Sequence, residues 1–223
     1  LQVRSVVSVG ESIVFMANEI TTPWQLDAWA YRNGSLEQIT QSDGVASVSG
    51  SRSCYVSRIS TLDTERAQFT VHTPTATHNI ASLAEASLVQ PNVRIMSVGP
   101  RGIPVAILLP RDGLSTKLPV LFDPYGGPHA QRVVASRAAY NSSQWFADQG
   151  FVVVIVDNTG TPGKGSVWER GVMHDLAEPV LDDQVEILRD LNDLEPRADT
   201  FACWYSRMEL WWLSRSSRRT ATQ

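Results

Sequence analysis

The sequence has little cysteine, no long apolar run and no excess of basic residues. Two cysteines, Cys54 and Cys203, occur in 223 residues, and their separation matches neither a disulfide framework nor the close pairs of a zinc site. The longest apolar run, FVVVIV at 151–156, has the length of a strand and falls far short of the roughly 20 residues of a membrane-spanning helix. We therefore expect two free thiols, no bound metal and no membrane span.

The charge balance also excludes classes of partner. Lys and Arg total 19 against 23 Asp and Glu, which gives a formal net charge of -4. Such a chain lacks the positive field that attracts nucleic acids or anionic membranes. We therefore expect no nucleic-acid partner.

The sequence has no recognisable nucleotide-binding or metal-binding motif. The segment DNTGTPGKGSVW at 157–168 is rich in glycine, but Lys164 is followed by Gly165 where a phosphate-binding loop needs Ser or Thr. A flexible glycine-rich crossover between two elements is the favoured interpretation. We therefore expect no cofactor. The four histidines lack the spacing of metal ligands, and no catalytic role is assigned to them; they are His72, His78, His129 and His174.

The first residues, LQVRSVVSVGESIVF, include no initiating Met, no basic region and no cleavage site of a signal peptide. The chain therefore reads as one that is entered partway through a domain. A cytoplasmic location is favoured on this ground, although the true N-terminus is not seen.

Residues 1–92 are predicted to be all-β. Short β-branched runs such as SIVFMA and CYVSRIS alternate with turn signals, and WQLDAWAYRNGSLEQIT is typical of a hairpin across Asn33-Gly34. Strands of this length and spacing are typical of the four-stranded blades of a β-propeller, or of part of a β-sandwich.

Residues 93–200 follow a different pattern, in which strands alternate with helices. A hairpin is predicted over 93–109, strands over 118–123 and 151–157, and helices over 136–150 and 179–194. This order indicates a sheet with parallel strands and covered faces. In the last helix an apolar face is expected to lie on that sheet; its residues are Val180, Ile187, Leu188, Leu191 and Leu194. We expect the sheet to end after its fourth strand, which would leave a central strand as an open edge.

Three motifs in order resemble one enzyme family. They are PYGGPHAQ after a strand, GFVVVIVDNTGTPGKG about 25 residues later, and DDQVEIL after a similar interval. This order is similar to the hydrolase domain of the prolyl oligopeptidase family of serine peptidases, in its dipeptidyl peptidase IV-like branch. The resemblance implies the last blade or blades of a β-propeller over 1–92, followed by the N-terminal half of an α/β-hydrolase domain over 93–200.

The resemblance also implies a site. Tyr125 would donate a hydrogen bond to the oxyanion of the tetrahedral intermediate, while Gly126 and Gly127 relieve crowding beside the substrate and Pro128 stiffens the turn. The chain departs from the family at one motif: Asp-x-Arg-Gly is common there, whereas this chain has Asp-Asn-Thr-Gly at 157–160.

The nucleophile that the family requires is absent from the sequence. No Gly-x-Ser-x-Gly elbow occurs anywhere in the chain, and without it the Asp and His that would follow the nucleophile cannot be assigned either. Where the elbow belongs, the sequence reads FACWYSRMELWWLSRSSRRTATQ, a tail with neither strand alternation nor a helical stripe.

Back-translation offers an explanation for this tail. Met is always ATG and Trp always TGG, so a shift of one base across MELWWL gives Trp, two variable codons and then Gly-Gly. A GAG codon for Glu209 would make the first variable residue serine, and a CTT codon for Leu210 would make the second phenylalanine. The pattern Trp-Ser-Phe-Gly-Gly is the family's elbow. We therefore predict a frameshift near residue 200 and an out-of-frame tail over 201–223.

The resemblance implies a serine peptidase that removes dipeptides from the N-termini of peptide substrates. It also implies that full-length relatives can form homodimers. As written, the chain carries only Tyr125 of that machinery, so we expect it to be inactive alone. Two alternatives stay open: an acylaminoacyl peptidase or oligopeptidase of the same family, and a non-catalytic β-rich interaction module or inert truncated product.

Overall fold

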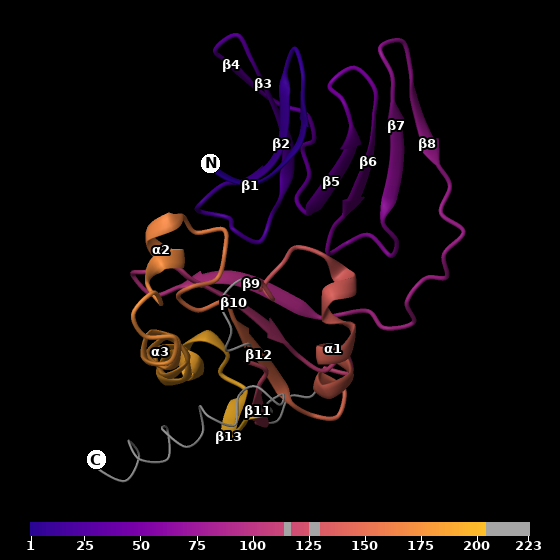
Figure 1. Cartoon of the computed structure of the whole chain (residues 1–223). Helices are drawn as coiled ribbons and strands as arrows, with labels where there is room; N and C mark the ends of the chain where they lie inside the picture. Colours follow the sequence, from indigo (N-terminus) through magenta and orange to yellow (C-terminus); the bar gives the residue numbers. More distant parts are fainter. Residues whose placement is uncertain (114–116, 125–129, 204–223) are drawn as a thin grey trace. The chain divides into compact units, whose positions relative to one another are not determined.

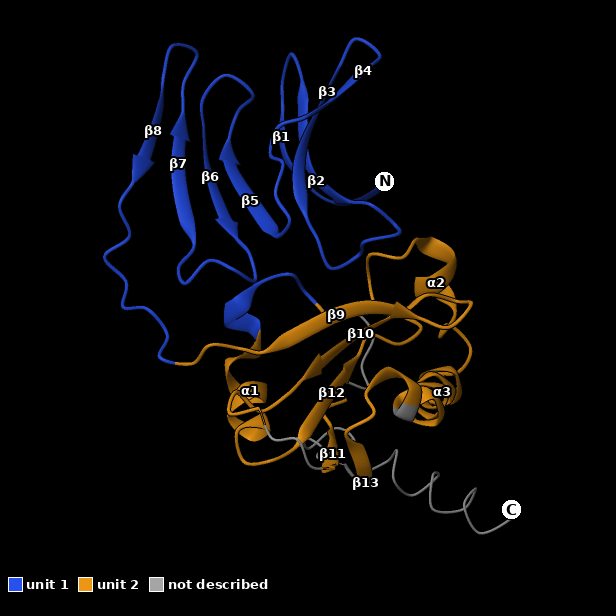
Figure 2. Ribbon diagram, turned by 180° about the vertical axis from the view of Figure 1, so that it is seen from behind, with its two compact units in different colours: residues 1–88, 134–139 blue, residues 89–133, 140–223 orange. Residues whose placement is uncertain are grey.

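The computed structural model describes residues 1–113, 117–124 and 130–203, and the chain forms two compact units (Figures 1 and 2). Unit 1 comprises Leu1–Leu88 and Val134–Ala139, and unit 2 comprises Val89–Val133 and the chain from Tyr140 onward. Residues 134–139 therefore pack with unit 1 although the chain on both sides of them belongs to unit 2. Two main-chain hydrogen bonds hold this segment, from Ala135 N to the Trp24 carbonyl and from Arg137 N to the Thr61 carbonyl.

Unit 1 consists of two antiparallel sheets of four strands each, and in each sheet the strands follow the order of the chain. The first sheet, here called the first blade, contains β1 (Gln2–Val9), β2 (Ile13–Asn18), β3 (Asp27–Arg32) and β4 (Ser35–Gln38). The second blade contains β5 (Val45–Gly50), β6 (Tyr55–Ser60), β7 (Gln68–His72) and β8 (Thr77–Ile80). Two successive four-stranded meanders are what a β-propeller predicts, and the all-β interpretation of this half is confirmed.

The predicted Asn-Gly hairpin is present between β3 and β4. Asn33 and Gly34 both have positive φ angles, 50° and 83°, and Arg32 pairs with Ser35 across the turn. Positive φ at both central positions is the property of a type I′ turn, whose twist matches that of the flanking strands.

The two blades share a small core. Met16 of β2, Ala28 of β3 and Ala46 of β5 are buried there, and partly buried apolar side chains surround them. The two alanines leave room for the sheets to approach each other, so this face of the first blade is covered by the second blade.

Unit 2 is built on a five-stranded sheet in the order β13-β11-β12-β10-β9. Its strands are β9 (Val93–Val98), β10 (Ile103–Leu108), β11 (Leu118–Phe122), β12 (Val152–Val156) and β13 (Ala198–Cys203). The pairs β9–β10 and β10–β12 are antiparallel, whereas β11 is parallel to both of its neighbours. The predicted hairpin and the predicted parallel pairing are therefore both present.

Helices lie on both sides of this sheet, with α1 on one side and α3 on the other (Figures 1 and 2). The helical segments are η1 (Arg137–Tyr140), α1 (Asn141–Ala147), α2 (Ser166–Arg170) and α3 (Glu178–Leu194). Of the predicted apolar face of α3, Val180, Ile187 and Leu191 are buried, and Leu188 and Leu194 pack against the same core. The α/β-hydrolase interpretation of this half is thereby confirmed as a partial fold.

The expectation that the sheet ends after its fourth strand is wrong. Residues 198–203 form a fifth strand, β13, which pairs with β11 from Leu118 opposite Ala198 to Phe122 opposite Cys203. Residues 201–203, assigned to the tail in the sequence analysis, are part of this strand. The chain turns back after α3 and adds a parallel strand, so β11 is central and β13 is the edge.

In the described part of the chain, no helix is long and apolar enough to cross a membrane.

Candidate active site

The candidate site lies at the carboxyl ends of β11 and β12. These strands are parallel neighbours, so they end at the same edge of the sheet, which is where open α/β sheets place their chemistry. Asp123 directly follows β11 and Asp157 directly follows β12. The predicted site residues come next in the chain after β11: Tyr125, Gly126, Gly127 and Pro128. All four of them lie outside the described residues, so their roles stay predictions.

Asp157 binds the backbone at Arg132 and Val133, shortly after the Tyr-Gly-Gly-Pro segment. Its carboxylate is 2 % exposed and accepts the backbone N–H of Arg132 at 2.8 Å and that of Val133 at 3.0 Å. Two main-chain hydrogen bonds to one buried carboxylate fix the position of this backbone relative to the end of β12.

Asp123 forms a second anchor at the end of β11. The guanidinium of Arg132 donates to both of its carboxylate oxygens, at 3.2 and 2.5 Å, and the hydroxyl of Ser143 in α1 donates to one of them at 3.1 Å. Two-point contact between Arg and a carboxylate is geometrically specific. Arg132 is thus held by both carboxylates, through its side chain by Asp123 and through its backbone by Asp157.

The crossover that follows β12 is buried and fixed. The carbonyl oxygen of Asn158 accepts hydrogen bonds from Trp168 Nε1 at 3.2 Å and from the Thr161 hydroxyl at 2.8 Å. The side-chain oxygen of Asn158 accepts from Gln184 Nε2 of α3 at 3.3 Å. Thr159 donates both its N–H and its hydroxyl to Asp183 of α3. The flexible crossover expected from the glycines is therefore not found, because buried polar side chains hold these residues.

Gly160 explains why glycine is needed in this crossover. Its φ angle is +96°, and a Cβ atom there would lie 2.8 Å from a methyl group of Val172. Both the left-handed backbone and the close approach exclude a side chain. The glycine thus serves packing between neighbouring segments.

Lys164 is engaged by the protein itself. Its ammonium group donates to the backbone carbonyls of Arg101, at 2.7 Å, and Gly102, and it lies 4.4 Å from the centre of the Trp168 ring. Burial lowers the pKa of Lys164, and the nearby charge of Arg101 lowers it further. These contacts give Lys164 a structural role.

Two other groups that were considered in the sequence, His72 and Cys54, lie in unit 1. His72 Nε2 lies 3.0 Å from the hydroxyl of Ser57 and its ring stacks on Tyr55 at 4.3 Å, but Ser57 is buried and out of reach of a substrate. Cys54 is a free thiol, as expected. No cluster of three or more His, Cys, Asp or Glu that could hold a metal ion occurs among the described residues.

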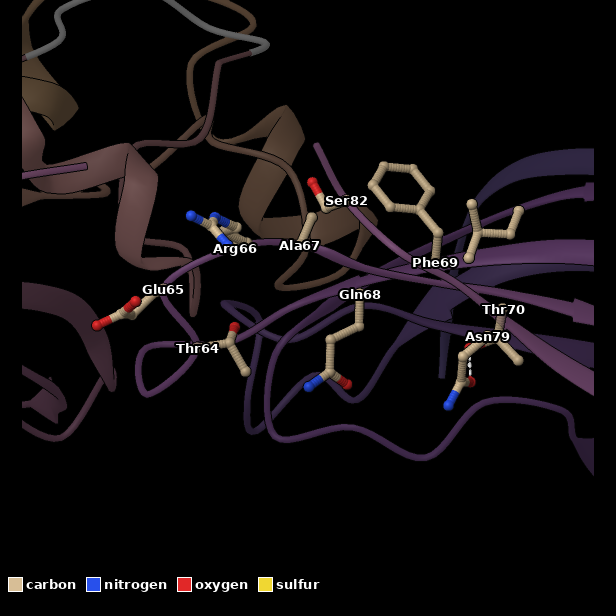
Figure 3. Close-up of a pocket in the computed structure, with 10 residues that line it drawn as sticks. Thr64, Glu65, Arg66, Ala67, Gln68, Phe69, Thr70, Asn79 and Ser82 are labelled. Carbon is tan, nitrogen blue, oxygen red and sulfur yellow. Dashed lines mark hydrogen bonds between the residues drawn. The ribbon is translucent and has the colours of Figure 1, made fainter. Parts of the chain in front are cut away.

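A hollow of about 550 Å³ opens on the second blade (Figure 3). Its lining includes Phe69 and Ile80, which are apolar, and Thr70, whose hydroxyl donates to the side-chain oxygen of Asn79 at 3.1 Å. The residues predicted to take part in catalysis lie outside the described part of the chain, and Asp123, Arg132 and Asp157 are not among the residues that line this hollow. This hollow is therefore not assigned to the candidate site.

The sequence analysis missed the groups that fix the candidate site. Asp123 and Asp157 stand directly after the two apolar strands, and a polar residue at the carboxyl end of a parallel strand is a signal that could have been used. Arg132 carries no such signal, and Asp183 belongs to the DDQVEIL motif used for the resemblance, but its contact with Thr159, 24 residues away, is not marked by that motif.

Comparison with known proteins agrees with this architecture. Residues 138–203 match the prolyl oligopeptidase family. This segment contains α1, β12, α2, α3 and β13. A protein of Aspergillus flavus named "Probable dipeptidyl peptidase 4" is 38 % identical over 72 residues, which are 31 % of this chain and 9 % of that protein.

Solved structures of the same architecture are similar over nearly the whole chain. The dipeptidyl peptidase 4 of Porphyromonas gingivalis superposes with a TM-score of 0.75 at 21 % identity, over 91 % of this chain and 31 % of that one. The acylaminoacyl peptidase of Pyrococcus horikoshii superposes with a TM-score of 0.68 at 15 % identity, over 89 % of this chain and 32 % of that one. The chain thus spans about a third of the length of these two proteins.

Proposed function

We propose that this chain is part of a serine peptidase of the prolyl oligopeptidase family that removes dipeptides from the N-termini of peptides, because residues 138–203 match that family and 72 residues are 38 % identical to a probable dipeptidyl peptidase 4. The reaction would proceed through an acyl-enzyme formed by a Ser-His-Asp triad. The peptide substrate is the expected partner, and the chemistry needs no cofactor.

The family match carries this proposal. It covers α1, β12, α2, α3 and β13, which include one of the two strands that end at the candidate site; β11 and the Tyr-Gly-Gly-Pro segment precede the matched residues. The two anchoring carboxylates, Asp123 and Asp157, support it further. They fix the chain on both sides of the Tyr-Gly-Gly-Pro segment, at the end of β11 and at Arg132.

Tyr125 is proposed as one donor of the oxyanion hole. A phenolic hydroxyl on a short turn after a core strand can stabilise negative charge that develops only in the transition state, and removal of one such donor lowers kcat by about 10²–10³-fold. In this proposal Gly126, Gly127 and Pro128 shape the turn that presents the hydroxyl.

The nucleophile is proposed to lie in the neighbouring reading frame. The family match ends at Cys203, which is also the last residue of β13, and in an α/β-hydrolase the elbow directly follows such a strand. The out-of-frame reading of Met208–Trp212 supplies the Trp-x-x-Gly-Gly part of that elbow at this point. Residues 204–223 themselves lie outside the described part of the chain.

An assay of two proteins tests the proposal. The 223-residue chain is expected neither to hydrolyse Gly-Pro-p-nitroanilide nor to react with a serine-directed fluorophosphonate, because loss of one triad residue removes several orders of magnitude of rate. The product of the complete gene with the frame restored is expected to do both. Fluorophosphonate-sensitive hydrolysis by the chain as written, or none by the complete product, would contradict the proposal.

The same assay separates the alternatives. An acylaminoacyl peptidase would prefer an N-acetylated amino-acid anilide to the free-amine dipeptide. An internal oligopeptidase would cleave a blocked peptide. A non-catalytic module would show neither hydrolysis nor labelling after restoration of the frame.

A further inference from the structure

The turn between β9 and β10 brings a cation to α3. Arg101, in this turn, places its Nη2 atom 2.5 Å from a carboxylate oxygen of Asp183 and 2.5 Å from one of Glu186. Asp183 is completely buried, and Glu186 is partly exposed. Arg101 therefore joins the hairpin of the sheet to the buried side of α3, and the two carboxylates raise its pKa although burial opposes them.

Asp183 needs this cation. Its other oxygen accepts the N–H of Thr159 at 2.6 Å and the hydroxyl of Thr159 at 2.7 Å. These donors are neutral, and a fully buried carboxylate is costly unless a positive charge is also close. Among the described residues, Arg101 is the cation that lies within ion-pair distance of Asp183.

The turn is held firmly enough to position Arg101. Gly99 and Gly102 have φ angles of +68° and +61°, and the N–H of Gly102 donates to the Gly99 carbonyl at 3.0 Å. A Cβ atom on Gly99 would lie 2.8 Å from a carboxylate oxygen of Glu186. Lys164 also donates hydrogen bonds to the carbonyls of Arg101 and Gly102 in this turn.

Position 159 is where this chain departs from the motif Asp-x-Arg-Gly, with threonine in place of arginine. We propose that Arg101 is a positioning residue: from the β9–β10 turn it supplies the positive charge that the motif carries at position 159, neutralises Asp183 and so fixes residues 157–161 at the end of β12. This inference concerns the folded chain and goes beyond the proposed peptidase activity, on which it does not depend.

The proposal predicts that loss of Arg101 loosens a defined set of groups. Asp183 anchors Thr159, and two residues earlier Asp157 holds the backbone of Arg132 and Val133. Greater mobility at Asp183 is therefore expected to loosen the backbone at 157–159 and, with it, the hydrogen bond from Val133 N–H to Asp157. Val133 has no contact with Arg101 among the interactions described above.

Amide hydrogen exchange on the full chain tests this proposal. In R101A, we expect the amides of Thr159 and Val133 to exchange at least about tenfold faster than in the unsubstituted chain. The matched control is R52A, which removes the exposed 2.7 Å ion pair between Arg52 and Glu37 in unit 1. It should leave these two amides unchanged.

Two double variants separate a charge effect from a loss of packing. In a D183N background, R101A should change the exchange of Thr159 by less than about twofold, because no charge remains to be neutralised. In an R101A background, T159R should restore most of the protection. A full-sized effect of R101A in D183N, or no protection regained in R101A/T159R, would overturn the proposal.

R101K keeps the test decisive if R101A does not fold. A lysine retains the charge on a flexible stem, so the proposal requires R101K to fold and to protect Thr159 to within about tenfold of the unsubstituted chain. Loss of folding in both variants, with R52A intact and R101A/T159R also unfolded, would contradict it.

Discussion

The two compact units bury their apolar residues in different ways. In unit 2 every residue of β10 and β12 is buried, because helices cover both faces of the sheet. In unit 1 the buried apolar cluster lies between the two blades, and Val9 on the first blade is 75 % exposed. Unit 2 thus has a core of its own, whereas the first blade keeps one face open to solvent in this chain.

The open face of the first blade is apolar along a row. Val9 pairs with Ile13, Ile13 with Tyr31, and Tyr31 with Leu36, and all four side chains are exposed. Directly paired residues of a sheet project from the same face. The comparison therefore predicts large effects of substitutions in unit 2 and small ones along this row.

The largest effect is expected for an isoleucine-to-alanine change made once in each unit. Ile187 of α3 is fully buried against the sheet, so I187A should lower the free energy of unfolding by about 2–5 kcal/mol. Ile13 is exposed, and I13A should cost less than about 1 kcal/mol. Urea denaturation of both variants measures the difference, and equal costs would refute the contrast between the units.

A slightly smaller loss is expected for D157A. The substitution leaves the N–H groups of Arg132 and Val133 without the carboxylate they bind, at a cost of about 1–3 kcal/mol for a buried unsatisfied group. We expect a destabilisation of about 2–3 kcal/mol in urea and faster amide exchange at Val133. Exchange at Val133 equal to that of the unsubstituted chain would show that Asp157 does not anchor this backbone.

The pH dependence should differ in sign between the units. In unit 2, burial alone would raise the pKa of Asp148, but hydrogen bonds from Arg111 and Gln144 and the charge of Arg111 lower it overall. A lowered folded-state pKa stabilises the fold above the ordinary carboxyl pKa near 3.8, and this stability is lost as the pH falls through the folded-state value.

Asp27 of unit 1 should behave in the opposite way. Burial raises its pKa, and hydrogen bonds from Thr40, Ser42 and Gln38 offset this only in part. The protonated form is favoured in the folded state, so this residue becomes less destabilising as the pH falls from above its raised pKa toward 3.8. Amide exchange followed from pH 5.5 down to about 2.5 should show D27N flattening the pH profile of unit 1 above 3.8 and D148N flattening that of unit 2 mainly below 3.8. Flattening in the wrong unit would contradict these assignments.

The smallest effect is expected along the open apolar row. V9T should change the free energy of unfolding by no more than about 0.5 kcal/mol and should reduce self-association, because it removes an exposed apolar group. Light scattering at increasing protein concentration measures this, with the buried substitution V154T as the matched control. A V9T variant as unstable as V154T would show that this face is covered in solution.

The parts of the fold that depend on local sequence could be predicted. Asn33-Gly34 predicted the β3–β4 hairpin, alternation predicted the strands, and the spacing of Val180, Ile187 and Leu191 predicted the buried face of α3. The fifth strand was missed because residues 198–203 belong to a segment whose tail was taken to be out of frame from residue 201. Only the pairing with β11 shows that the strand continues to Cys203.

The candidate site was less predictable than the fold. Tyr125 was found through resemblance to a family, since a lone tyrosine after a strand carries no chemical signal of its own. The contact between Arg101 and Asp183 spans two elements far apart in the chain. No pattern of spacing or composition marks such a pair, because its geometry is set by how the hairpin and α3 pack.

The most direct test of the central claim is the DNA sequence that encodes Met208–Trp212. If a serine-peptidase elbow lies in the neighbouring frame, the codon for Glu209 is GAG, which makes the shifted reading Trp-Ser-x-Gly-Gly. A GAA codon would place asparagine at the position of the nucleophile and would contradict the claim.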